Sequence, residues 1–267
     1  MPLKIITIHF LLDEILKALD FKDDKRAQVS MTVALVAAYF FAGCQQKSLD
    51  FLIGHGYIKS LSKSRFNRRL HAIEDDLWQV ILNLMARFHQ LTNKDKVFLV
   101  DTFPVPACHN IRIRRSRLYR QESFRGYCAS KKQYCFGLKV CLIVTEQGKP
   151  VEILLAPGSC NDLSALRSME IDLPAGSTLF TDGGFLDGVF EALLLENADI
   201  HLVTPRRSNM KEQLPGWLEY LRVHYRQRVE TSFSQITDLF ARSIHAVTSR
   251  GFELKVFLTV LAFSIVY

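Results

Sequence analysis

Short metal-ligand spacings are missing from this sequence. Its six cysteines include no Cys-x-x-Cys pair, and its histidines never recur at the spacing of a zinc site. We therefore expect no zinc site, and we interpret the cysteines as reduced thiols of a cytoplasmic protein. The serines and cysteines also lack a nucleophile-elbow motif, which argues against a covalent hydrolase.

Apolar runs of membrane-spanning length are missing too. The N-terminus does not have the pattern of a signal peptide. Residues 256–267 are almost wholly apolar but too few to cross a bilayer. Residues 27–44 carry no charge but include polar side chains such as Gln28, Ser30 and Thr32, so we predict a buried helix there. No membrane partner is expected.

Basic residues outnumber acidic ones, with 34 Lys and Arg against 27 Asp and Glu, for a formal net charge of +7. This field favours polyanionic partners, nucleic acid first among them, although a basic soluble protein without such a partner has the same balance. The hydrophobic fraction of 48% is that of a packed globule. A length of 267 residues suggests two domains.

Helical periodicity dominates the first 93 residues, which we predict to be an all-α, helix-turn-helix-like module. Apolar residues recur three and four apart from Phe66 to Phe88, after Gly54 and Gly56, and Ser62 or Ser64 can cap this helix. Cations at a helix N-terminus oppose the helix dipole, and a bound DNA phosphate would compensate for this. The alternative is a basic helix face that is simply solvated and binds no phosphate. The cations are Lys63, Arg65, Arg68 and Arg69.

The pattern changes after Asn93, where a second domain, residues 94–267, begins with three strands and continues with alternating helices and strands. The first strand, Val97 to Val100, is predicted to stop at Asp101 and Pro104. The further predicted strands are residues 134–145, 151–155, 178–181 and 200–204, and the predicted helices are residues 162–169, 186–196 and 218–243.

Three acidic residues are placed to converge. Asp101 and Asp182 each end a predicted strand, and Glu230 lies in the long helix. Carboxylates at strand ends share an edge of an α/β sheet, and Mg²⁺ prefers such oxygen ligands, with Mn²⁺ as the expected substitute. Two ions about 4 Å apart catalyse phosphodiester chemistry in such sites. Taken singly, each acid is more often a surface residue or a cap, and Asp182 is also explained as turn chemistry before Gly183 and Gly184.

A basic cluster lies between the first two predicted strands, interleaved with Tyr119, Phe124 and Tyr127. Cations with aromatic rings suit phosphate contact and base stacking, although a solvated loop or a localisation-like patch has a similar composition. The cluster consists of Arg112, Arg114, Arg115, Arg117, Arg120, Arg125, Lys131 and Lys132. On the long helix, Arg226 and Arg228 are placed either to grip DNA or to pair with Glu230.

Several motifs resemble the bacterial insertion-sequence transposases of the IS nine-eight-two family. They are Ser-Arg-Phe-Asn-Arg-Arg-Leu (64–70), Val-Asp-Thr-Phe-Pro-Val-Pro (100–106), Arg-Gly-Tyr-Cys-Ala-Ser-Lys-Lys (125–132), Gly-Leu-Lys-Val (137–140), Arg-Val-Glu-Thr-Ser-Phe-Ser-Gln-Ile (228–236) and Ile-His-Ala-Val-Thr-Ser-Arg-Gly-Phe-Glu-Leu-Lys-Val (244–256). The resemblance covers nearly the whole chain.

This resemblance implies an RNase H-like catalytic domain of the retroviral-integrase type, with Asp101, Asp182 and Glu230 as its metal-binding triad. It further implies cleavage of transposon ends and joining to target DNA by a homo-oligomer assembled on double-stranded DNA, in the bacterial cytoplasm at the nucleoid. Two positions depart from the pattern, since Gly183 replaces the usual Lys or Arg and Thr237 stands where related enzymes carry Lys. A nuclease without strand transfer and an inactive DNA-binding remnant are the alternatives.

Overall fold

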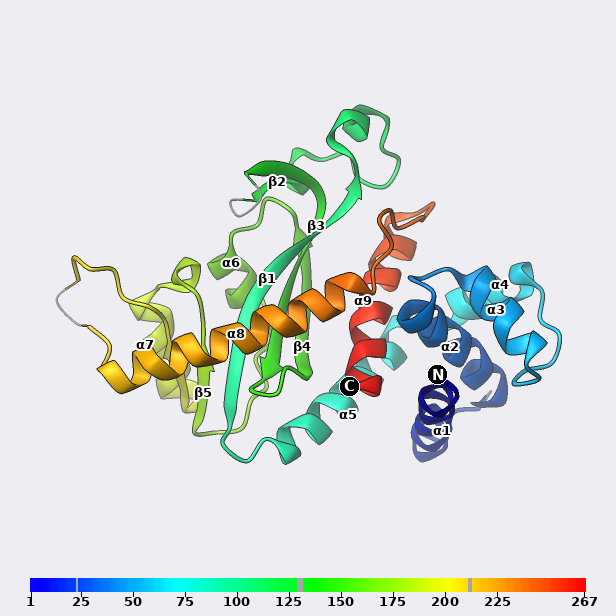
Figure 1. Ribbon diagram of the computed structural model, residues 1–267, viewed down its shortest axis with the longest axis horizontal. Coiled ribbons are helices and arrows are strands. Elements are labelled where there is room, and N and C mark those ends of the chain that lie inside the picture. The colour runs from blue at the N-terminus through cyan, green and yellow to red at the C-terminus, as the bar shows by residue number, and fades with distance from the viewer. Residues whose placement is uncertain (23, 129–131, 211–212) are drawn as a thin grey trace. The chain divides into compact units, whose positions relative to one another are not determined.

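The computed structural model describes residues 1–22, 24–128, 132–210 and 213–267. The chain divides into two compact units (Figure 1). Unit 1 consists of Met1–Met85, Ile236–Ile244 and Glu253–Tyr267. Unit 2 consists of Ala86–Gln235 and His245–Phe252. Helices make up unit 1, whereas unit 2 is built on a sheet.

Unit 1 packs around helix α2 (Asp24–Phe40), which contacts α1 (Pro2–Ala18), α3 (Gln45–Gly54) and α4 (Lys63–Ala72). The predicted buried helix is confirmed, because Met31 and 33–38 of α2 are buried. Among the described residues no single helix is long and apolar enough to cross a membrane; α2 from Lys25, joined with α3, has the length and composition, but the two meet at a bend of 112°.

The predicted helix from Phe66 to Phe88 is wrong as one element. The structure has two helices, α4 and α5 (Asp75–Thr92), separated at Ile73, whose backbone is extended. Two acidic residues open α5 and favour a new helix N-terminus there. The buried stripe of α5 differs from the predicted one, because Leu84 and Phe88 are exposed and Trp78 is buried. Of the predicted alternatives Val80 and Ile81, Ile81 is the buried residue. The predicted cap is confirmed at Ser62, which accepts a hydrogen bond from the Arg65 backbone N–H at 3.4 Å.

Helix α9 (Ser249–Val266) contains the apolar C-terminal run. Its side chains from Leu258 to Ile265 are almost all fully buried, which fits a core helix rather than an amphipathic surface helix. The sequence placed residues 94–267 in a single second domain, whereas the contacts group Glu253–Tyr267 with the helices of unit 1. The all-α character of unit 1 thus includes a segment from the far end of the chain.

Unit 2 is organised by a mixed sheet in the order β2-β3-β1-β5-β6, with β4 also paired to β3. Strands β1 and β3 are antiparallel, as are β3 and β4, whereas β5 runs parallel to β1 and β6 parallel to β5. The predicted strands are all present. The bounds are β1 Val97–Cys108, β2 Arg125–Cys128, β3 Gln133–Thr145, β4 Pro150–Pro157, β5 Ser177–Phe180 and β6 Ile200–Val203.

Strand β1 does not stop at Asp101 and Pro104, as the sequence had predicted, but continues to Cys108. Its pairing with β5 ends at Leu99, and beyond that point no strand of the described residues pairs with this edge of β1. Proline lacks an N–H and is tolerated where a strand edge is unpaired. Pro104 and Pro106 therefore sit in a strand that still pairs with β3 on its other edge.

Alternate residues of β1 face two different layers. Phe98 and Val100 join a buried cluster with side chains of α6 (Asp162–Arg167) and α7 (Gly188–Ala198). On the other face Phe103 meets Phe233 of α8 (Gly216–Asp238) with ring centroids 5.3 Å apart. Helix α8 crosses the strands of the sheet (Figure 1). The three predicted helices of this unit are thereby confirmed, with shifted ends.

Candidate active site

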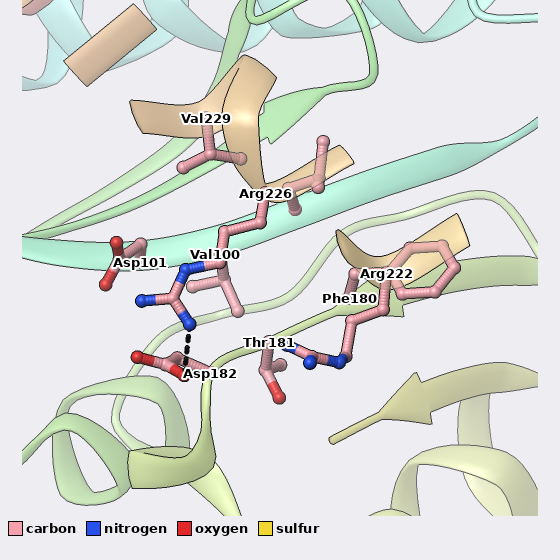
Figure 2. Close-up of a pocket in the computed structure, with 9 residues that line it drawn as sticks. Val100, Asp101, Phe180, Thr181, Asp182, Arg222, Arg226 and Val229 are labelled. Carbon is pink, nitrogen blue, oxygen red and sulfur yellow. Dashed lines mark hydrogen bonds and ion pairs between the residues drawn. The ribbon is translucent and has the colours of Figure 1, made fainter. Parts of the chain in front are cut away.

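Asp101 lies on β1 two residues beyond the last pair with β5, and Asp182 lies two residues beyond the end of β5. Because β1 and β5 run parallel and their last pair is Leu99 with Phe180, Asp101 and Asp182 lie at matching positions, and both line the same pocket. Residues of β1, of the end of β5 with the two positions after it, and of α8 form its walls (Figure 2). They are Leu99, Val100, Asp101, Phe180, Thr181, Asp182, Arg222, Arg226 and Val229.

Asp101 is partly buried, and burial raises the pKa of its carboxyl to about 6. The nearby carboxylates of Asp182 and Asp162 raise this pKa further, while the Thr102 backbone N–H, which donates to Asp101 Oδ1 at 2.7 Å, and the Arg226 cation lower it. A carboxyl desolvated beside other carboxylates gains from any cation that enters the pocket.

Arg226 ties the acidic residues together. Its Nη1 donates to Asp182 Oδ1 at 3.0 Å and its Nε donates to Glu230 Oε1 at 3.1 Å, one helical turn further along α8. Figure 2 shows the guanidinium between the two aspartates of the pocket. Glu230 is exposed and does not line the pocket itself. Two of the three predicted acids thus share a pocket, and the third is joined to it through Arg226.

The donor chemistry of this centre suits a hard divalent cation, because Asp101, Asp182 and Glu230 offer only carboxylate oxygens. Within the described ranges, no three acidic, histidine or cysteine side chains are close enough together to form a metal ligand set. Instead the Arg226 guanidinium supplies positive charge to Asp182 and Glu230. The oxygen ligands of the three acidic residues suit such an ion. In this structure the Arg226 cation pairs with two of them, Asp182 and Glu230.

A second polar cluster, which the sequence did not single out, lies on the opposite side of β1. Asp162 at the start of α6 accepts a hydrogen bond from Thr102 Oγ1 at 2.7 Å and pairs with Lys139 Nζ of β3 at 2.9 Å. The Asp162 carboxylate also acts on the pKa of Asp101. A signal was present in the sequence, since Asp162 opens the first predicted helix after the strand at residues 151–155 and Lys139 belongs to the Gly-Leu-Lys-Val motif.

The two glycines after Asp182 differ in their surroundings. A Cβ at Gly184 would lie 3.0 Å from the Asp162 carboxylate oxygen, a tight contact that a larger residue could relieve only by shifting that side chain. At Gly183 the nearest atom to an added Cβ is 3.7 Å away, which is ordinary contact. Asp182 meanwhile accepts a hydrogen bond from the Gly183 N–H at 2.7 Å, so it does serve the turn as well as the pocket.

A family model described as the transposase DDE domain matches residues 91–246. The chain belongs to this family. The matched range contains Asp101, Asp182 and Glu230, and membership implies an RNase H-like fold for unit 2, in keeping with its mixed sheet. Searches of curated proteins and of solved structures each found no match.

The basic residues of this DDE transposase that the sequence singled out are exposed, apart from Arg69, which is partly buried. Four belong to α4 of unit 1 and two, Arg226 and Arg228, to α8. The others lie in residues 109–128 and 132–134, which we term the basic arm; they are Arg112, Arg114, Arg115, Arg117, Arg120, Arg125 and Lys132. Lys131 lies outside the described residues.

The aromatic residues of the basic arm fall into two pairs. Tyr119 is buried, stacks on Phe124 with centroids 4.0 Å apart and meets Phe252 edge-on, so the expectation that Tyr119 stacks on bases is wrong. Tyr127 and Tyr134 are instead exposed. Tyr134 was missed because it opens a predicted strand, where an aromatic residue is usual.

Proposed function

We propose that this chain is a DNA transposase of the IS nine-eight-two family that cuts transposon ends and joins them to target DNA. Asp101, Asp182 and Glu230 would hold Mg²⁺, for which Mn²⁺ substitutes. The observation that carries the proposal is the shared pocket of Asp101 and Asp182, with Arg226 linking Glu230 to it. Membership in the transposase DDE family supports the same reading.

The reaction requires the attacking oxygen to be activated and the leaving oxygen to be stabilised, which is the chemistry that bound divalent cations supply. In cleavage, water would attack the phosphorus and the 3′ oxygen of the transposon end would leave as a hydroxyl. In transfer, this 3′ hydroxyl would attack a phosphodiester of the target strand and displace its 3′ oxygen. The three carboxylates would provide the negative charge that holds the cations. Neither step needs a side-chain nucleophile, in keeping with the missing nucleophile elbow.

DNA would be held by the cations of the basic arm and of α4. Each lysine or arginine that neutralises a phosphate releases counterions, so binding would weaken steeply as salt rises. Arg226 and Arg228 project from the helix that carries Glu230, where the scissile strand must pass. We expect the protein to act as a homo-oligomer on double-stranded DNA at the nucleoid, in the cytoplasm.

The test separates chemistry from binding. Asp101→Asn keeps the size of the side chain but removes the charge that would bind a divalent ion, so nicking of a transposon-end duplex in Mg²⁺ or Mn²⁺ should be lost. Loss of one negative charge should leave DNA affinity in a gel-shift titration equal or slightly higher. The matched control is Asp199→Asn, an exposed position in the left-handed conformation that asparagine also adopts.

A control that nicks at the parent rate, beside an inactive but DNA-binding Asp101→Asn, supports the proposal. A parent that binds without ever nicking points to an inactive remnant, the reading that the Gly183 departure favours. A parent that nicks but never joins strands would be a nuclease of the same fold.

A further inference from the structure

Two exposed tyrosines face each other at the end of the β2–β3 hairpin. Tyr127 of β2 and Tyr134 of β3 are cross-strand partners. Their rings lie 5.2 Å apart at 63°, and the residues remain 58% and 51% exposed. Aromatic rings of this size are usually withdrawn from water, as Tyr119 is fully and Phe124 partly within the same segment. Two adjacent rings left in solvent form a ready contact surface.

The hairpin is firmly mounted on the rest of unit 2. A Cβ on Gly126 would collide with the carbonyl oxygen of Gly158 at 1.8 Å, so β2 presses directly on the turn after β4. The Ser159 N–H donates to the Ser123 carbonyl at 2.9 Å, and the Gly158 N–H donates to the Gly137 carbonyl at 3.0 Å. The tyrosines are therefore presented by a braced backbone, and little order would be lost on binding.

The surroundings of the pair are positive. The Arg125 guanidinium lies 4.9 Å from the centroid of the Tyr134 ring. Asn110, at the start of the arginine-rich turn η1 (Asn110–Arg115), donates to the Tyr134 carbonyl at 2.6 Å and so ties that turn to β3. The partner that fits this surface carries both negative charge and flat π-faces, as nucleic acid does.

We propose that Tyr127 and Tyr134 form a stacking corner for an unpaired nucleotide of the DNA substrate, with the arginines of the basic arm on its flanking phosphates. This inference rests on the proposed function. Bases within a duplex stack on each other and offer only their edges in the grooves. An exposed aromatic ring can cover the flat face of a base inside the sequence only when that base has left the stack, and a staggered cut leaves such unpaired bases at a strand end.

The probe is a duplex that carries 2-aminopurine at an unpaired strand end, compared with the same duplex in which that base is paired. Stacking on tyrosine quenches its fluorescence, so the parent protein should quench the unpaired probe and leave the paired probe unchanged. The double variant Tyr127→Leu, Tyr134→Leu keeps apolar bulk in the hairpin but removes the π-faces. It should lose the quenching and bind the unpaired probe roughly tenfold more weakly, with its affinity for the paired duplex unchanged.

Tyr127→Phe, Tyr134→Phe should behave as the parent, and Tyr267→Leu, an exposed tyrosine of unit 1, is the matched control. A leucine variant that still quenches overturns the inference, as does a parent that treats the two probes alike. If the leucine variant does not fold, the parent protein is photocrosslinked to a duplex with 5-iodouracil at its unpaired end. Crosslinks at Tyr127 or Tyr134 support the inference, and crosslinks only at other residues overturn it. If the inference fails but the parent protein still nicks paired transposon ends, the proposed function stands. A parent protein that binds neither probe contradicts both the inference and the proposed function.

Discussion

Arginines occupy two different situations in unit 2. In the basic arm, Arg112, Arg114, Arg115, Arg117 and Arg120 are exposed, and none forms an ion pair with a described residue. On α8, by contrast, Arg222 pairs with Glu219 at 2.5 Å, and Arg226 bonds both Asp182 and Glu230. Paired cations hold acidic side chains in position, whereas unpaired ones keep their full charge for a ligand. We therefore expect the arm to contribute most of the DNA binding and α8 to organise the acidic residues.

The largest effect is expected from the arm. Arg114→Ala, Arg115→Ala and Arg117→Ala together should reduce the slope of log affinity against log salt by about 2–3, since each phosphate contact contributes about 0.9. Affinity at low salt should fall roughly 100-fold. Arg222→Ala, which removes a paired cation, should leave the slope nearly unchanged in the same gel-shift titration. Equal losses from both variants would end the distinction between the two groups of arginines.

The buried Asp101 of the acidic pocket should lower the stability of the folded protein, whereas the exposed arginines of the arm should not. The Asp101 pKa is raised from 3.8 to about 6, so the folded state holds this proton more tightly than the unfolded state does. Ionising Asp101 in the folded state therefore lowers the free energy of unfolding. This loss is absent below about pH 4, grows between pH 4 and pH 6, and reaches about 2–3 kcal/mol above about pH 6.

Asp101→Asn should therefore raise Tm by about 5 °C at pH 7.5 and hardly at all at pH 4. Scanning calorimetry at both pH values measures this difference, with Asp199→Asn as the control. A Tm gain that is the same at both pH values would show that burial of the charge is not its cause.

Arg226 should compete with a divalent ion. Arg226→Gln removes the cation that bonds Asp182 and Glu230, so Mn²⁺ should bind the DNA-free protein about tenfold more tightly by isothermal titration calorimetry. Arg228→Gln, two residues further along α8 and exposed, removes the same charge without breaking these bonds. An equal increase in Mn²⁺ affinity in both variants would show that the loss of net charge, and not the loss of the bonds from Arg226 to Asp182 and Glu230, is the cause.

The smallest effect is expected at Gly183, where the nearest atom to an added Cβ is 3.7 Å away. Gly183→Lys should be tolerated and should add one phosphate contact, so that DNA binds a few-fold more tightly and the salt slope steepens by about 0.9. Gly184→Lys is the contrasting variant, because its Cβ would meet the Asp162 carboxylate. An unchanged slope for Gly183→Lys would place the DNA path elsewhere.

Much of this molecule was predictable from local sequence. Alternation and turn residues indicated the strands of unit 2, and helical periodicity indicated α2, α6, α7 and α8, because these signals report which face of an element is buried. The two aspartates were recognised as candidates since each follows a β-prone run. A pair between an arginine of α8 and Glu230 was foreseen as one of two alternatives. The further bond from Arg226 to Asp182 was not foreseen, because spacing shows that a pair can form within a helix but not what else it contacts.

The remainder depended on long-range pairing. The extension of β1 through Pro104 and Pro106 is explained only by the loss of the β5 neighbour beyond Leu99. The burial of Tyr119 depends on Phe252, which is distant in sequence. The grouping of 253–267 with unit 1 likewise arises from contacts that periodicity does not specify.

The central claim is that Asp101, Asp182 and Glu230 bind divalent ions as one centre. A crystal structure of the protein grown with Mn²⁺ and a transposon-end duplex, with anomalous diffraction data, tests it most directly. The account predicts anomalous peaks about 2.1–2.2 Å from oxygens of Asp101 and Asp182, a second peak about 4 Å away, Glu230 among the ligands and Arg226 moved onto a phosphate. Manganese bound elsewhere, or Arg226 still bonded to Asp182 and Glu230 beside bound DNA, would contradict it.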